Sequence, residues 1–163
     1  MSDADLETLV ARLRGRTGLC GPTIVRSIET GALVKYAAAT GQTDPLYIDA
    51  QAAAKGRFGA IIAAPTYLSS FTNEALVGVM VSDTGFDMFL HTDDGVESFV
   101  PIRAGDTIAA TACYADAFVK SGGKGPRLFQ IAEMRLTNQK QQLVATVRVG
   151  MVSFDRDGAT VDG

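Results

Sequence analysis

Three residues in this chain are candidates for moving protons in a reaction, namely Asp44, Tyr47 and His91, which is the only histidine. A carboxylate and an imidazole can act as acid and base near neutral pH, whereas a phenol, with an ordinary pKa of about 10, is a poor base. These residue types predict proton-transfer chemistry. A lone histidine is weak evidence for catalysis. A structural role for His91, hydrogen-bonded at the end of a strand, is therefore the favoured interpretation.

The first half of the chain is predicted to be helical. Apolar residues at helical spacing and the usual start and stop residues predict helices over 3–14, 29–40, 49–56 and 65–81. The last of these begins at Pro65 and is apolar on nearly all sides, so we expect it to be buried. Between the second and third helices, Asp44 and Tyr47 fall in a turn around Pro45.

The second half of the chain is predicted to form strands. Alternation and turn signals indicate strands over 22–28, 107–120, 127–138 and 143–154. A hairpin is also expected, with strands 86–91 and 97–102 on either side of an Asp-Gly turn at 92–95. Helices followed by a meander of long strands favour an α+β fold. We predict a hot-dog fold, in which an antiparallel sheet wraps around the central apolar helix.

Composition narrows the function classes. The 163 residues fit one domain over 1–163, with a core at about 22–154 and the helix 3–14 before it. The net charge of −3 offers no basic footprint for nucleic acid. The acidic N-terminus and short apolar runs predict neither a signal peptide nor a membrane partner, and hence a cytoplasmic protein. Cys20 and Cys113 stand alone, so we expect reduced thiols and no metal site.

Two segments resemble the MaoC-like family, which includes R-specific enoyl-CoA hydratases and 3-hydroxyacyl dehydratases. They are Tyr36–Tyr47, which reads YAAATGQTDPLY, and the later Ala63–Thr66. The stretch 100–107 and the segment 136–146 resemble the N-terminal-type dehydratase domains of that family, so the resemblance covers about 23–154. It implies a hot-dog fold and a substrate carried as a thioester of coenzyme A or of the phosphopantetheine on an acyl-carrier protein. It implies no other cofactor.

The segment Gly41–Tyr47 departs from the family's hydration motif, Gly-Asp-x-Asn-Pro-x-His. Gln42 stands where the family has its catalytic Asp, Tyr47 where it has its His, and Asp44 where it has Asn. Adding water to an enoyl thioester needs a base for the water and an acid for the carbon, and Gln42 supplies neither. The resemblance therefore implies an accessory subunit, either homodimeric or paired with a catalytically intact hot-dog chain.

Other functions remain open at this point. Asp44, Tyr47 and His91 could form a rewired site for dehydration, hydration or isomerisation. The chain could instead bind thioesters without catalysis, or act as a thioesterase of the same fold. The resemblance implies that the thioester lies along the helix that starts at Pro65 and Thr66, whose N–H groups could meet its carbonyl. Gln42 is a further candidate contact.

The basic, glycine-rich segment 120–127 offers Lys124 and Arg127 for the phosphates of the carrier. Glycine and lysine are also ordinary residues of loops. A solvated hairpin loop is therefore the favoured interpretation of this segment.

Overall fold

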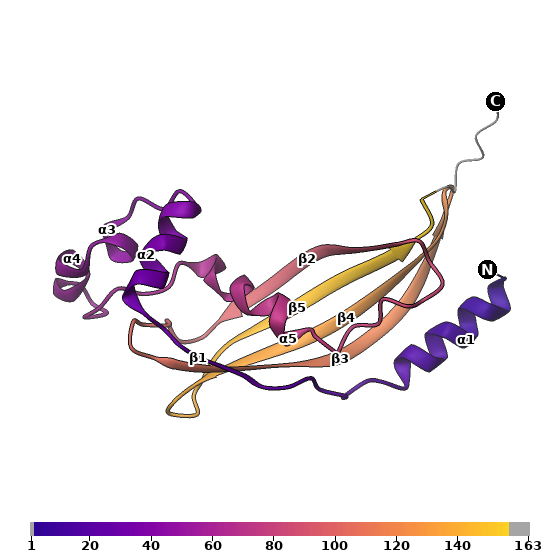
Figure 1. The fold of residues 1–163 in the computed structure, drawn as a ribbon, viewed down its shortest axis with the longest axis horizontal. Helices are drawn as coiled ribbons and strands as arrows, with labels where there is room; N and C mark the ends of the chain where they lie inside the picture. Colours follow the sequence, from indigo (N-terminus) through magenta and orange to yellow (C-terminus); the bar gives the residue numbers. More distant parts are fainter. Residues whose placement is uncertain (1, 157–163) are drawn as a thin grey trace.

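A single antiparallel sheet of five strands forms the body of the molecule (Figure 1). The computed structural model describes residues 2–156, so both ends of the predicted domain, residue 1 and 157–163, lie outside the described residues. The strands run in the order β1-β3-β4-β5-β2. Their bounds are β1 Ile24–Ser27, β2 Met88–Ser98, β3 Thr107–Gly122, β4 Gly125–Asn138 and β5 Leu143–Phe154. The long meander β3–β4–β5 occupies the centre, and β1 and β2 are the two edges.

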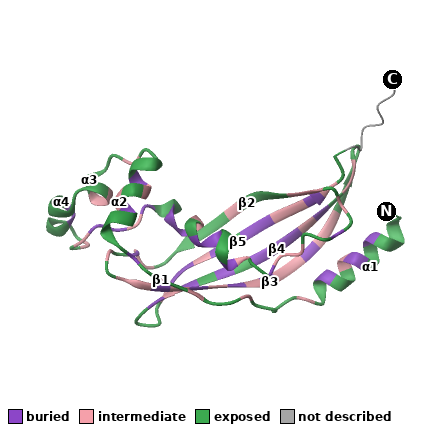
Figure 2. Ribbon diagram, in the orientation of Figure 1, coloured by how far each residue is buried: buried purple, intermediate pink, exposed green. Residues whose placement is uncertain are grey.

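Buried residues alternate with less buried ones along the central strands (Figure 2), as expected for a sheet with one buried face. On β5, Ala145, Val147 and Val149 are fully buried, as their spacing predicts. On β3, the small side chains of Ala110 and Ala112 are also fully buried. Small residues on this face leave room for another segment to approach closely, and Phe71, Ala75 and Val79 belong to the same buried cluster as these alanines.

The long helix predicted over 65–81 is not continuous. The structure has a seven-residue 3-10 helix, η1 (Pro65–Phe71), and a single α-helical turn, α5 (Thr72–Ala75). Ser69, Ser70 and Asn73 are poor helix formers, and Gly78 adopts a left-handed φ of 76° that ends the segment. The predicted burial of this segment is nevertheless found, because Phe71, Ala75 and Val79 are almost wholly removed from solvent.

The prediction of a hairpin around 92–95 is also wrong, because this segment lies within one continuous strand. β2 runs straight through the Asp-Gly signal and pairs with β5 from Met88 to Ser98. The extra residue is absorbed as a bulge between His91 and Asp93, opposite Gly150. A Cβ at Gly150 would collide with the hydroxyl of Thr92 and lie 2.8 Å from Oδ1 of Asp93. Only a glycine therefore leaves room for the side chains of this bulge.

Four helices precede the central segment: α1 (Asp3–Arg14), α2 (Thr30–Ala39), α3 (Pro45–Ile48) and α4 (Ala50–Lys55). α1 begins at the capping residue Ser2 and buries Leu6, Leu9 and Leu13. Figure 1 shows α1 alongside β3, whereas α2, α3 and α4 cluster beyond one end of the sheet. In the described part of the chain, no helix has the length and apolar character needed to span a membrane.

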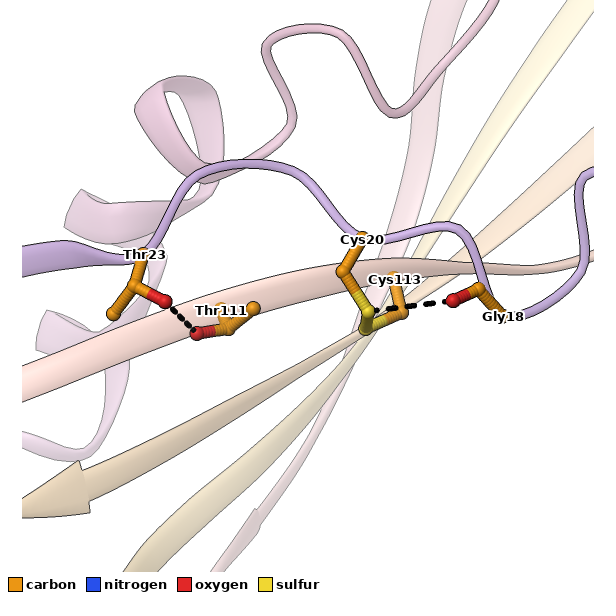
Figure 3. Close-up of a disulfide and its surroundings, with 5 residues drawn as sticks. All are labelled: Gly18, Cys20, Thr23, Thr111 and Cys113. Carbon is orange, nitrogen blue, oxygen red and sulfur yellow. Dashed lines mark hydrogen bonds between the residues drawn. A yellow bond between two sulfur atoms is a disulfide. The ribbon is translucent and has the colours of Figure 1, made fainter.

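Cys20 and Cys113 form a disulfide, so the prediction of two free thiols is wrong (Figure 3). Cys20 forms an isolated antiparallel bridge with Cys113, between the hydrogen bonds Tyr114 N–H to Leu19 O and Gly21 N–H to Ala112 O, both 2.9 Å. This is a non-hydrogen-bonded pair, whose side chains lie closest together. The two cysteines are 93 residues apart in the sequence, and their spacing therefore carried no sign of the pairing.

Candidate functional site

A largely apolar cavity of about 280 Å³ lies at the end of the sheet that carries α2, α3 and α4. Its walls come from α3, the loop after α4, the start of η1 and the end of β2. They are Tyr47, Arg57, Phe58, Ile62, Ala63, Ala64, Pro65, Leu68, Ser98, Phe99, Val100, Pro101, Ile102 and Val144. Apolar walls with few polar groups are typical of small-molecule sites, and this volume is near the lower limit of roughly 300 Å³ for such sites.

Backbone hydrogen bonds join the two segments that form most of the cavity wall. Ile62 and Arg103 form an isolated antiparallel bridge. Beside it, the N–H of Ala63 donates to the carbonyl of Ile102 over 2.8 Å. The N–H of Phe99 donates to the carbonyl of Val144 over 2.8 Å, which fixes the end of β2 against the start of β5. The wall is therefore held by the sheet and not by side chains alone.

Short capped helices present Tyr47 to the cavity. Pro45 occupies the first turn of α3, and Oδ1 of Asp44 accepts the N–H of Leu46 over 2.8 Å. Oδ1 of Asp49 then caps α4 by accepting the N–H of Gln51 over 2.8 Å. Asp44 therefore has a structural use, as the N-cap of the turn that carries Tyr47.

Of the residues predicted to bind substrate or to do chemistry, Tyr47 and Pro65 line this cavity, whereas Gln42, Asp44 and Thr66 do not. The carbonyl of Thr66 accepts a hydrogen bond of 2.7 Å from the phenol of Tyr36, which ties α2 to η1. The helix that begins at Pro65 is a single short 3-10 segment. Its N-terminal dipole is therefore smaller than that of the predicted helix of seventeen residues, 65–81.

His91 lies outside the cavity lined by Tyr47 and Arg57. Its Nε2 is 2.8 Å from Oδ1 of Asp94, across the bulge in β2. The ring is about half exposed and lines a separate pocket with Thr72, Asn73, Leu76, Val77 and Met151. Tyr47 and His91 therefore face different cavities, and the structure does not bring the predicted trio of Asp44, Tyr47 and His91 together in one chain.

Lys124 and Arg127 lie at the β3–β4 hairpin, where β3 ends at Gly122 and β4 begins at Gly125. The loop is thus tighter than the sequence suggested. β4 and β5 pair Leu128 with Ser153, whereas the cavity residue Val144 lies at the other end of β5. The two predicted phosphate contacts are therefore at the opposite end of the sheet from the cavity (Figure 1).

Arg57 is the basic residue that does line the cavity. Sequence reasoning missed it, because it belongs to no motif. The only local signal is its position directly after Gly56, which ends the alanine-rich helix α4.

A buried polar group lies against the inner face of the sheet, away from the cavity. Burial raises the pKa of Tyr114 to about 12. Its hydroxyl donates to Oε1 of the fully buried Gln130 over 3.1 Å. A phenol with this pKa is no base at neutral pH. Within residues 2–156, no cluster of three or more His, Cys, Asp or Glu side chains is arranged to hold a metal ion.

The family described as "FAS1-like, dehydratase domain region" matches residues 22–147, most of the chain. The chain belongs to this dehydratase-region family. A curated relative, the "UPF0336 protein" of Streptomyces griseus subsp. griseus, is 32% identical over 95 residues, which is 56% of this dehydratase-region chain and 63% of the relative. The matched region thus spans less than two thirds of that relative's length.

Solved structures confirm the hot-dog fold of this dehydratase-region chain. A MaoC-like dehydratase superposes with a TM-score of 0.77 at 22% identity, covering 89% of this chain and 44% of that one. A chain of the HadBC complex of Mycobacterium tuberculosis, described as a 3R-hydroxyacyl-ACP dehydratase, superposes with a TM-score of 0.70 at 17% identity, covering 85% and 97%. The predicted α+β hot-dog fold and the predicted MaoC-like resemblance are therefore both confirmed.

Proposed function

We propose that this chain is the accessory subunit of a two-chain hydratase or dehydratase that acts on 3-hydroxyacyl or enoyl thioesters. The observation that carries the proposal is the composition of the cavity. Tyr47 stands there at the position of the family's histidine, and the lining residues include no aspartate, glutamate or histidine. The walls suit an acyl chain, but reversible addition of water needs an acid and a base.

In this proposal, the partner chain carries an intact Gly-Asp-x-Asn-Pro-x-His segment and performs the proton transfers. The present chain contributes the apolar cavity, which holds the acyl part of a coenzyme A or acyl-carrier-protein thioester. The description of HadBC as a dehydratase complex supports the idea of two chains of this fold acting together. We propose the cytoplasm as the location of the assembly.

Edge strand β2 is the surface on which we expect the partner to bind. It pairs with β5 on one side only and leaves its other side open along the whole of Met88–Ser98. Leu90, Val96 and the adjoining Phe99 are exposed apolar side chains along this edge. An open edge of this length is a template for another strand. Ser98 and Phe99 also line the cavity, so a partner on β2 would lie beside the acyl site.

The proposal is tested with a trans-2-enoyl thioester, offered to the purified chain alone and together with an intact hot-dog partner. We expect turnover only in the mixture, and co-elution of the two chains in size-exclusion chromatography. A complex of two copies of this chain that remains inactive until the partner displaces one copy would agree with the proposal.

Two variants test whether this chain has chemistry of its own. Asp44→Asn removes the carboxylate but keeps an N-cap for α3, and His91→Gln removes the imidazole. Turnover by the isolated chain that either variant abolishes would overturn the accessory role and favour a rewired active site. Activity of the mixed complex should survive both changes, since the partner supplies the acid and the base.

A further inference from the structure

Arg57 places a positive charge on a cavity that otherwise has no charged side chain. Within residues 2–156, the ion pairs are Arg14–Asp116, Arg26–Glu74 and His91–Asp94. None of them involves Arg57. Its guanidinium carbon lies over the ring of Phe58, 4.5 Å from the centroid. This contact orients the guanidinium at the cavity without neutralising its charge.

The other polar side chains of the cavity are hydroxyls. Tyr47 and Ser98 are the remaining lining residues with polar side chains. Arginine has five N–H donors and no acceptor, and each hydroxyl can donate one hydrogen bond. The cavity therefore offers several donors and a positive charge, which suit a ligand group with acceptor oxygens and negative charge.

We infer that Arg57, together with Tyr47 and Ser98, binds an oxyanion group of the thioester ligand. The group is a carboxylate at the far end of the acyl chain, because the proposed function places the acyl part in this cavity, and a planar guanidinium binds a carboxylate with two parallel hydrogen bonds. A phosphate of the carrier offers similar oxygens, and its binding here would be the other outcome of the test. This inference rests on the proposed function, because it names the part of the same ligand that this cavity recognises.

The size of the cavity limits the rest of the ligand. A volume of about 280 Å³ suits a short apolar segment, since sites for drug-sized molecules begin at roughly 300 Å³. Lys124 and Arg127 cannot serve the same anion in this chain, because they lie at the other end of the sheet. Arg57 is thus the specificity-determining cation of the cavity.

Three saturated probes separate the two sources of the anion, and none of them can undergo hydration. Hexanoyl-pantetheine is neutral, adipoyl-pantetheine carries a terminal carboxylate, and hexanoyl-phosphopantetheine carries a phosphate. Binding is measured by calorimetry with the wild-type chain in complex with its partner. We expect one charged probe to bind about tenfold more tightly than the neutral one, as a charge-assisted pair of hydrogen bonds would provide. The probe that does so identifies the source.

Arg57→Gln should remove this preference and leave the affinity for the neutral probe unchanged. The matched control is Arg12→Gln, which changes the same residue type at an exposed position on α1, and it should keep the preference. Tyr47→Phe should weaken the favoured charged probe by a few-fold and spare the neutral one. Arg57 is exposed, so we expect the circular dichroism spectrum of the variant to match the wild type.

Equal affinities for all three probes would overturn the inference, and so would a failure of all three to bind. The inference would also be overturned if Arg57→Gln lowered the affinity for all three probes by the same factor. The same holds if Arg12→Gln removed the preference for the charged probe as fully as Arg57→Gln does. Turnover of an enoyl thioester by the mixed complex is measured in parallel. If that turnover persists while the charge preference is absent, the inference fails and the proposed function stands.

Discussion

The hydroxyl of Tyr114 donates a 3.1 Å hydrogen bond to the side chain of Gln130, and both side chains lie on the buried face of the sheet. Gln130 in turn bonds both backbone groups of Val81: its Oε1 accepts the N–H over 3.2 Å, and its Nε2 donates to the carbonyl over 2.7 Å. One glutamine on β4 therefore fastens the segment that follows α5 to the sheet.

We predict that Gln130→Met lowers the free energy of unfolding by about 2–4 kcal/mol. Methionine has a similar volume but leaves the polar groups of Tyr114 and Val81 without a partner in the interior, and each such buried group costs roughly 1–3 kcal/mol. Urea denaturation measures the change. Gln51→Met, at an exposed position on α4, should have almost no effect. A Gln130 variant as stable as this control would contradict the assigned network.

The pKa of about 12 for Tyr114 gives a pH dependence of stability. Burial favours the neutral phenol in the folded state, so the folded protein holds this proton more tightly than the unfolded chain does. The resulting stabilisation is fully present below about pH 10 and is lost as the pH rises from about 10 through 12. The stability difference between wild type and Tyr114→Phe should therefore shrink across this range. A difference that stays constant in urea denaturation from about pH 9 to 12 would contradict the assignment.

Reduction of the Cys20–Cys113 disulfide should destabilise the protein by about 2–5 kcal/mol, because the bond closes a chain segment of 93 residues. The measurement is urea denaturation with and without dithiothreitol. The double variant Cys20→Ser, Cys113→Ser is the control, since reductant should not change its stability. Thiol titration of the native protein tests the bond directly. Two titratable thiols in the freshly isolated protein would contradict the bond.

Gly150→Ala should weaken the pairing of β2 with β5. The new Cβ would collide with the hydroxyl of Thr92 and crowd the carboxylate of Asp93 at 2.8 Å, so the bulge must move, at a cost of roughly 1–3 kcal/mol. Hydrogen exchange of the β2 amides measures the effect. Gly95→Ala is the matched control on β2, because a Cβ there would lie 3.8 Å from Cβ of Arg148, an ordinary contact. Faster exchange in the control than in Gly150→Ala would refute this role for Gly150.

The sequence predicted the parts of the fold that depend on local periodicity. β5 was found from its apolar alternation and β3 and β4 from the turn signals around them, and α1 was found because Leu6, Leu9 and Leu13 recur at helical spacing. The Asp-Gly signal at 94–95 led to the wrong prediction of a turn, because the pairing of β2 with β5 outweighs a local turn preference. The bond between Cys20 and Cys113 depends on a register that no local pattern encodes.

The candidate site was predicted only where a motif existed. Tyr47 and Pro65 were identified through the family resemblance, and both line the cavity. Arg57 was missed, because its place depends on how the chain turns after α4 ends. The phosphate contacts predicted at Lys124 and Arg127 were chosen for their charge alone, and charge does not reveal which end of a sheet a residue occupies.

The bulge at His91–Asp93 has a consequence for the synthesis of the protein. At a flat open edge strand, strands of further copies can pair one after another, and insoluble aggregates form. β2 is bent at its bulge and carries Asp93, Asp94 and Glu97 along its length, and bends and charges of this kind discourage endless stacking. We therefore expect this chain not to aggregate in the cell when it is synthesised in excess of the proposed partner chain.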